Sequence, residues 1–256
     1  MTFTKSAIQN INEICFSENG LLRHEFNRLY PALFDNPENH IAVIRALAKS
    51  HKGLSRTEII ENAKIPNGRS ATQVLEELEQ SSFIMAYFPF GKKKKDKLYR
   101  ITDEYSVFYL RFIENQPYEG EGTFMQLSQL QTYNPDSYRA WTGYAFENVC
   151  MKHILSIKKA LGFSGVYTKI FSFLKKASET EEGLQIDMLI ERADRVIDLF
   201  EIKFYNTEFV MTNTYAEKLR QRTRLFTRLS KTKCQVRLSM ITPFGLKIPI
   251  IVQVAA

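Results

Sequence analysis

The chain has 256 residues, 44% of them hydrophobic and 25% charged, so it can bury more than one core and is too apolar to be disordered throughout. Lysine and arginine outnumber aspartate and glutamate by 35 to 28, and the net charge of +7 suits a polyanionic partner without requiring one. Neither a bilayer-spanning stretch nor a signal-peptide core occurs, and three widely spaced cysteines give no disulfide or zinc pattern, so we expect a cytoplasmic protein without membrane contact.

Residues 1–35 carry apolar side chains at spacings of three and four, as at Ile8, Ile11 and Ile14. This period predicts helix. The segment is short, and we interpret it as a helical lead-in that packs on another part of a protein.

Residues 36–103 predict three helices followed by a hairpin. The first helix is IAVIRALAKS, and capping-box patterns at Ser55–Glu58 and Ser70–Gln73 predict where the next two begin. The third helix has three apolar residues on its inner face, namely Val74, Leu75 and Leu78. Two strands, SFIMAYFPF and KLYRIT, are joined by GKKKKD. This order resembles a winged helix-turn-helix.

The lysine run is open to two interpretations. It is a solvated hairpin tip that needs no partner, or it is a wing whose lysines gain affinity for phosphates by releasing counterions. The candidate nucleic-acid contacts of this domain are Arg69, Lys92, Lys93, Lys94 and Lys95. Winged helices also serve as spacers between proteins.

Residues 104–135 contain an apolar helix, EYSVFYLRFIE, and then a polar connection rich in proline and glycine that marks the expected domain boundary. Residues 136–256 predict a long helix, three strands (GVYTKIFSFL, LQIDMLIE and VIDLFEIKF), an amphipathic helix around 215–230, and the strands QVRLSMIT and IPIIVQV. Together the chain is predicted to be of mixed α and β class, and its second part to be a sandwich in the order αβββαβ.

Charged residues interrupt two of these strands. Glu201 and Lys203 are two residues apart and so project from the same face of a strand. A tight turn at residues 192–195 would bring the strand that holds Asp187 alongside. The three side chains are thus expected to converge at one end of the sheet.

Two neighbouring carboxylates repel each other unless a cation neutralises them, and hard oxygen ligands select Mg²⁺ or Mn²⁺. Such an ion can promote phosphodiester cleavage, and Lys203 can orient the attacking water or stabilise charge on the phosphate. The simpler alternative is an exposed ion pair of Glu201 with Lys203 and an aspartate that only ends its strand.

The spacing D-x(13)-E-x-K between hydrophobic flanks resembles the PD-(D/E)xK nuclease superfamily, over roughly residues 136–254. The resemblance implies a restriction-endonuclease-like fold and a metal site of Asp187, Glu201 and Glu147, with Lys203 as a further catalytic residue. Ile186 stands where the motif has proline. The basic residues on the following helix either form its wet face or line a phosphate track; they are Lys218, Arg220, Arg222, Arg224 and Arg228. Of these, Arg220 and Arg224 are the candidate nucleic-acid contacts.

Nearly the whole chain also resembles the C-terminal half of archaeal-type AAA+ ATPases, which occur in bacteria too. The resemblance is carried by FSENGLLRHEFNRLY, IAVIRALA, LYRITDEYSVFYLRFIE, GYAFENVC and LFEIKFYN. It implies that residues 1–35 end the lid of an ATPase module, and that this module is a partner. No G-x(4)-G-K-[ST] occurs, so we expect no ATP site in this chain.

The sequence therefore predicts metal-dependent hydrolysis of nucleic acid, with DNA expected ahead of RNA, and with the winged helix adding DNA or interdomain contacts. The alternative is a non-catalytic module that binds nucleic acid, regulates the ATPase, or self-associates as a homo-oligomer.

Overall fold

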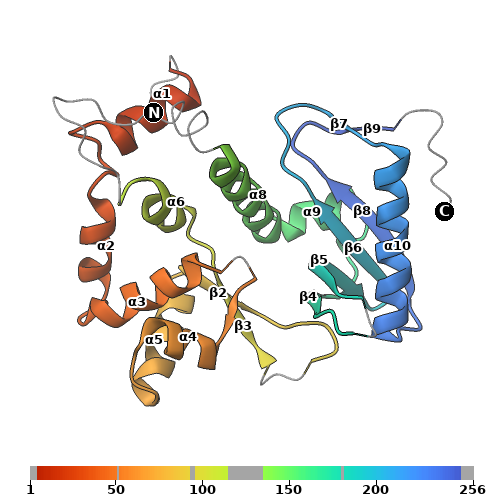
Figure 1. The fold of residues 1–256 in the computed structure, drawn as a ribbon, viewed down its shortest axis with the longest axis horizontal. Helices are drawn as coiled ribbons and strands as arrows, with labels where there is room; N and C mark the ends of the chain where they lie inside the picture. The colour runs from red at the N-terminus through yellow and green to blue at the C-terminus, as the bar shows by residue number, and fades with distance from the viewer. Residues whose placement is uncertain (1–4, 51, 93–95, 115–134, 180–181, 249–256) are drawn as a thin grey trace. The chain divides into compact units, whose positions relative to one another are not determined.

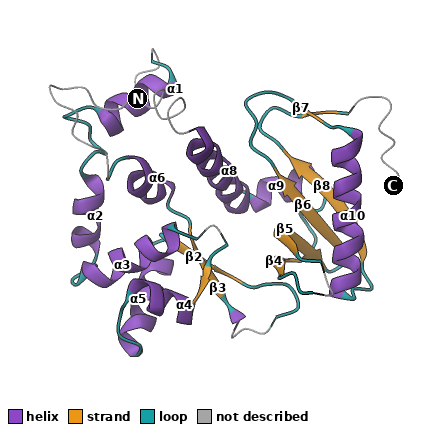
Figure 2. Cartoon of the chain, viewed as in Figure 1, coloured by secondary structure: helices purple, strands orange, loops and turns teal. Residues whose placement is uncertain are grey.

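The computed structural model describes residues 5–50, 52–92, 96–114, 135–179 and 182–248. The chain divides into two compact units, Met1–Ala86 with Leu98–Trp141, and Tyr87–Lys97 with Thr142–Ala256. The first unit is mostly helical with a small sheet, and the second is built on a four-stranded mixed sheet with helices (Figure 1 and Figure 2). The predicted mixed α and β class is confirmed at this level.

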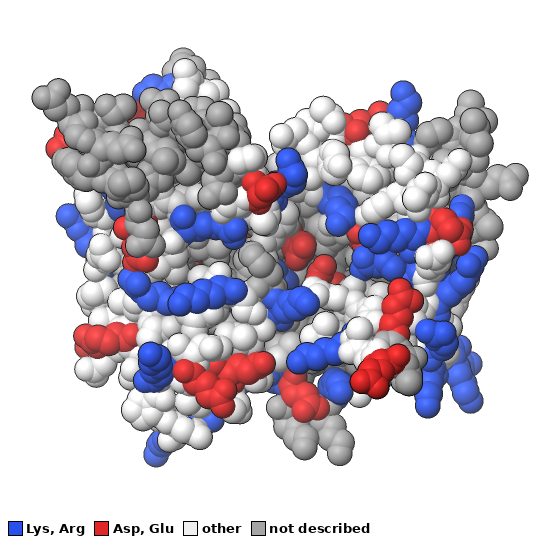
Figure 3. All heavy atoms as spheres, in the orientation of Figure 1, with Lys and Arg blue, Asp and Glu red and all other residues white. Residues whose placement is uncertain are grey.

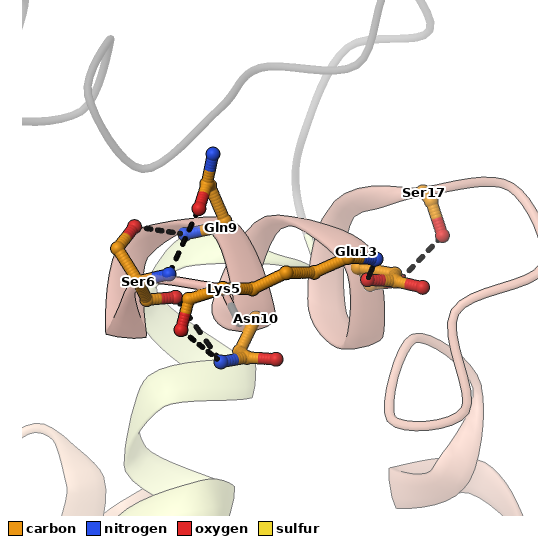
Figure 4. Close-up of polar contacts among 6 residues, drawn as sticks. All are labelled: Lys5, Ser6, Gln9, Asn10, Glu13 and Ser17. Carbon is orange, nitrogen blue, oxygen red and sulfur yellow. Dashed lines mark hydrogen bonds and ion pairs between the residues drawn. The ribbon is translucent and has the colours of Figure 1, made fainter. Parts of the chain in front are cut away.

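Short helical segments open the first unit: α1 (Ala7–Ile11), the π-helical turn η1 (Asn12–Phe16) and α2 (Glu25–Leu33). Ser6 and Gln9 form a reciprocal capping box at the start of α1, and Figure 4 shows it beside the ion pair of Lys5 with Glu13. The helical lead-in is therefore present as three pieces, while residues 1–4 lie outside the described part.

The rest of the first unit consists of helices and a small sheet. Its elements are α3 (Pro37–Ala48), β1 (Leu54–Ser55), α4 (Arg56–Ala63), α5 (Arg69–Gln80), β2 (Ile84–Tyr87), β3 (Leu98–Ile101) and α6 (Glu104–Phe112). The strands form a sheet in the order β1-β3-β2. The helices bury apolar side chains at helical spacing, including Ile44, Leu47, Ile59, Leu75 and Leu78.

One of the two predicted capping boxes is present. Ser55 accepts from the amide of Glu58 and the Glu58 side chain returns to the amide of Ser55, so α4 begins as expected. The prediction for Ser70 was wrong, because α5 begins earlier, at Arg69. Gly68 takes the N-cap position in extended backbone without a side-chain cap, which leaves Ser70 inside the helix.

The second unit has an antiparallel run of three strands and one parallel strand. Its elements are the end of α8 (Pro135–Lys152), α9 (Ile154–Ala160), β4 (Thr168–Lys175), β5 (Leu184–Arg192), β6 (Val196–Ile202), β7 (Phe209–Val210), α10 (Asn213–Ser230), β8 (Gln235–Ile241) and β9 (Leu246–Lys247). The sheet order is β4-β5-β6-β8, and β6 and β8 are parallel because α10 carries the chain back between them. The expected strand IPIIVQV lies outside the described residues beyond Ile248.

Helices cover both faces of this sheet. On one face Leu225 and Phe226 of α10 pack against side chains that include Ile197 and Leu199. On the other face Ile154 of α9 packs in a cluster with Met188, Ile190 and Phe200. Alternate residues of β6 thus serve opposite cores, which accounts for its continuous burial.

The alternation breaks once, in β5. Phe171 pairs with Leu189, and Phe173 pairs with Ile186. Ser172, which lies between the two phenylalanines, therefore faces two residues of β5, Asp187 and Met188. Ile186 packs on the α10 side and Met188 on the α9 side, although they are two positions apart. This is a β-bulge, which puts an irregularity at Asp187.

Residues 87–97 belong to the second unit by their contacts. The amide of Phe90 donates to the carbonyl of Ser172 at 2.7 Å, on the edge strand β4. The ring of Phe90 packs against Phe171 and Phe226. Residues 88–90 thereby cover a sheet edge and extend the α10-side core. Among the helices described, none has both the length and the apolarity to cross a membrane.

Candidate functional site

Glu201 is the most constrained of the predicted site residues. It lies near the end of β6, and its side chain is only 9% exposed. The hydroxyl of Tyr215 donates to its Oε1 at 2.7 Å, and Lys203 Nζ lies 3.3 Å from the same oxygen. Arg222 Nη2 lies 3.7 Å from Oε2. Two cations and one hydroxyl therefore compensate this carboxylate.

Tyr215 and Arg222 both come from α10, which begins behind an N-cap at Thr212. Burial, followed by the hydrogen bond to Glu201, raises the pKa of Tyr215. The hydroxyl is therefore a firmly protonated donor that fixes the orientation of the Glu201 carboxylate.

Asp187 occupies the corresponding place on the neighbouring strand. The last paired residues of β5 and β6 at this end are Met188 and Phe200, and Asp187 and Glu201 are the next residue beyond each. Gln185 Nε2 donates to Asp187 Oδ1 at 2.7 Å. The structure thus places the two acids at the same end of adjacent strands.

Arg222 links the two strands. Its Nη2 donates to the carbonyl oxygen of Gln185 on β5 at 2.6 Å and faces Glu201 on β6. A cavity of about 600 Å³ lies beside this contact, and its lining includes Gln185, Asp187 and the α10 residues Lys218 and Arg222. The site thus has an open side next to Asp187.

Lys203 follows β6 and is 44% exposed at its side chain. Its backbone amide donates to Ile241 of β8 at 3.0 Å, which fixes the chain there. The ammonium contacts Glu201, as the two-residue spacing in a strand predicts.

Glu147 is placed differently from the other acids. It lies on α8, one turn before Cys150, and its charge adds to burial in raising the pKa of that thiol to about 11. The same helix contributes Met151 to the α9-side core, whereas Glu201 is held on the α10 side. The part of the chain that the structure describes contains no group of three His, Cys, Asp or Glu side chains able to hold a metal ion. The three predicted metal ligands are therefore not gathered into one such group.

The predicted nucleic-acid contacts come from different elements of the chain. Arg69 is exposed at the first position of α5, and Lys92 is exposed. The remaining lysines of the run, Lys93, Lys94 and Lys95, lie outside the described residues. Arg220 and Arg224 both pair with Glu217, at 2.9 and 3.4 Å, and so form a local network on α10. Lysines and arginines gather along this helix in Figure 3.

The sequence interpretation missed the roles of Tyr215 and Arg222. A signal was present, because Tyr215, Leu219, Arg222 and Phe226 follow spacings of four, three and four. That spacing describes the buried stripe of an amphipathic helix. An arginine within the stripe indicates a buried acid or an anion as its partner.

No family model, no curated protein and no solved structure matched the chain.

Proposed function

We propose that the second unit is a metal-dependent nuclease domain of the PD-(D/E)xK type that hydrolyses phosphodiester bonds in nucleic acid, DNA ahead of RNA. The observation that carries this proposal is the placement of Asp187 and Glu201 one residue beyond the last ladder pair of β5 and β6, with Lys203 beside Glu201. The order of helix, three strands, helix and parallel strand supports a restriction-endonuclease-like sandwich.

The donor set fits a hard divalent cation. Mg²⁺ is commonly held by one or two carboxylates together with substrate phosphates, so Asp187 and Glu201 suffice without a third acid. When bound, the ion would polarise the phosphoryl oxygen and activate a water molecule. Tyr215 orients Glu201 by donating to Oε1, and Gln185 orients Asp187 in the same manner. Lys203 is exposed enough to donate to a phosphate oxygen or to the attacking water.

Cleavage of plasmid and single-stranded substrates with Mg²⁺ or Mn²⁺ tests this proposal. Replacing Asp187→Asn or Lys203→Ala is expected to lower the cleavage rate by about 100-fold or more, because each change removes a group that acts on the developing charge. Glu191→Gln is the matched control, since Glu191 lies on the same strand but pairs opposite Ile197, away from the site. If all three variants cleave at the same rate, the assignment of the site to Asp187 and Lys203 is wrong.

A second candidate is a non-catalytic module that binds nucleic acid or regulates an ATPase. It is favoured by the compensation of Glu201 by Lys203, Arg222 and Tyr215, which completes the contacts of this acid without a metal ion. Salt-dependent binding with no metal-stimulated cleavage would select this function.

We also propose that the first unit is a winged helix from the C-terminal part of an archaeal-type AAA+ ATPase. Three helices, α3, α4 and α5, and a sheet in the order β1-β3-β2 support this assignment. An ATPase module and a second copy of the chain are the proposed protein partners. Co-purification of the chain with a separately expressed ATPase module of that family tests the first of these.

A further inference from the structure

The cavity beside Asp187 is built from α10 and the start of β5. The α10 residues that line it are Lys218, Gln221, Arg222 and Leu225, which share one side of the helix because they are three, four and seven positions apart. Its volume of about 600 Å³ is ample for a phosphate group with its sugar. The cavity thus presents basic side chains next to a predicted catalytic acid.

Arg222 is held in place before any ligand arrives. Its Nη2 makes both of the contacts found among the described residues, the hydrogen bond to Gln185 and the approach to Glu201. A guanidinium has five N–H donors in a rigid fork, so Nη1 and Nε remain to donate to an anion. The side chain is 32% exposed, which leaves it accessible from the cavity. Because the Arg222 side chain is already fixed, it loses little conformational entropy when an anion binds.

Two other arginines of α10 are engaged elsewhere. Arg220 and Arg224 pair with Glu217, and neither lines the cavity. Arg224 is 71% exposed, so its charge is largely screened by solvent. One set of basic residues on the helix, Lys218 and Arg222, therefore lines the cavity. A second set, Arg220 and Arg224, forms ion pairs with Glu217 of the same helix.

The charges around the cavity make anion binding depend on a cation. Lys218 and Arg222 are opposed by two acids in the lining, Asp187 and Glu182. A divalent cation at Asp187 would remove the repulsion that this carboxylate exerts on an anion. Phosphate and a divalent cation are then expected to favour each other's binding.

We propose that this cavity is a subsite for a backbone phosphate of a nucleic-acid strand, bound by Lys218 and Arg222 beside the acid pair. The inference rests on the proposed function, whose reacting phosphate would lie at Asp187 and Glu201. It assigns substrate positioning to Lys218 and Arg222, in place of Arg220 and Arg224.

The experiment measures binding of a fluorescently labelled single-stranded DNA to the full chain by anisotropy, with Ca²⁺ present. Lys218→Ala and Arg222→Ala are each expected to weaken binding about tenfold, since each removes a charge-assisted hydrogen bond. Arg224→Ala, the matched control on the same helix, is expected to change affinity less than about twofold. Each of the first two variants should also reduce the slope of log affinity against log salt by about 1.

Omitting Ca²⁺ is expected to weaken binding by the wild type and to have little effect on Asp187→Asn, in which the opposing charge is already gone. Wild-type affinity in both Lys218→Ala and Arg222→Ala, or an equal loss in Arg224→Ala, overturns the subsite. If Arg222→Ala fails to fold by circular dichroism, the exposed Lys218 decides the question alone.

Cleavage is measured separately on the same proteins. Weakened binding in Lys218→Ala and Arg222→Ala without cleavage by the wild type keeps the subsite and overturns the hydrolase. If the wild type cleaves, and if neither substitution changes cleavage or binding, the proposed hydrolase activity is retained and the subsite is overturned.

Discussion

Single charged residues within apolar strands were the most informative sequence signals for the candidate site. Asp187, Glu201 and Lys203 stand out because apolar strand sequence surrounds them, and the structure brings the two acids to one end of the sheet. Arg222 was predicted only as one of five basic residues on this helix, and Tyr215 only as a residue of its apolar side, so that neither was predicted to contact Glu201. Their contact with Glu201 depends on how α10 is rotated over the sheet, which only packing determines.

At the same scale, buried tyrosines predict a loss of stability in alkali. Burial raises the pKa of Tyr30 and of Tyr215 above the ordinary value of about 10. The unfolded chain then binds fewer protons than the folded chain once the pH exceeds about 10, so the stability contributed by these hydroxyls is present below that pH and falls as the pH rises.

We expect the unfolding free energy, measured in guanidinium chloride from pH 8 to 11, to fall less steeply above pH 10 in Tyr30→Phe than in the wild type. Tyr167→Phe is the control, because Tyr167 is 71% exposed. The same slope in the wild type and in Tyr30→Phe would contradict the prediction.

Helices and strands were predicted well where period and capping agree. In the first unit α3, α4 and α5, and in the second β4, β5, β6, α10 and β8, lie within a few residues of their expected positions. The bulge in β5 could not be predicted, because its apolar residues fit either phase of the alternation. The predicted start of α5 was wrong because Ser70 matches a capping-box pattern, whereas Gly68 is the N-cap residue in the structure.

The two capping patterns make an element-scale test of this difference. Ser55→Ala is expected to lower the unfolding free energy by about 1 kcal/mol, because it leaves the amide of Glu58 without its acceptor. Ser70→Ala is the matched control, and it is expected to be neutral or stabilising by about 0.5 kcal/mol because alanine is a better helix former. Equal losses in the two variants would show that Ser70 caps α5 after all.

At the scale of the whole molecule, the contacts divide the chain in a way that its linear order does not suggest. Residues 87–97 lie between two strands of the first unit, yet they contribute Phe90 to the core of the second. The sequence predicted a solvated or phosphate-contacting tip there, since its lysines dominate the composition. The apolar Phe-Pro-Phe before them, Phe88 to Phe90, was interpreted only as the end of a strand.

Two units with separate cores are expected to open separately. Phe226→Ala removes a fully buried ring from the second unit and should cost about 3–5 kcal/mol there. Hydrogen exchange is then expected to accelerate in β5 and β6 while α3 and α4 keep their wild-type protection. Ile44→Ala, in the core of the first unit, should produce the reverse pattern. Uniform acceleration in both units would mean that the chain unfolds as one cooperative block.

The extra residue opposite Ser172 has a consequence for how the β4–β5 hairpin finds its partner. On either side of it, β5 presents apolar side chains in opposite phase, so Ile186 and Met188 serve different cores. A slip of one position, in either direction, would turn the apolar side chains of both halves toward the wrong layers. Deleting Asp187 would leave Ile186 and Leu189 two positions apart, so that both would still face the α10-side core and the ladder would be regular. The apolar side chains thus do not require the extra residue, and what the bulge adds to the strand is Asp187 itself, one position beyond the last ladder pair with β6.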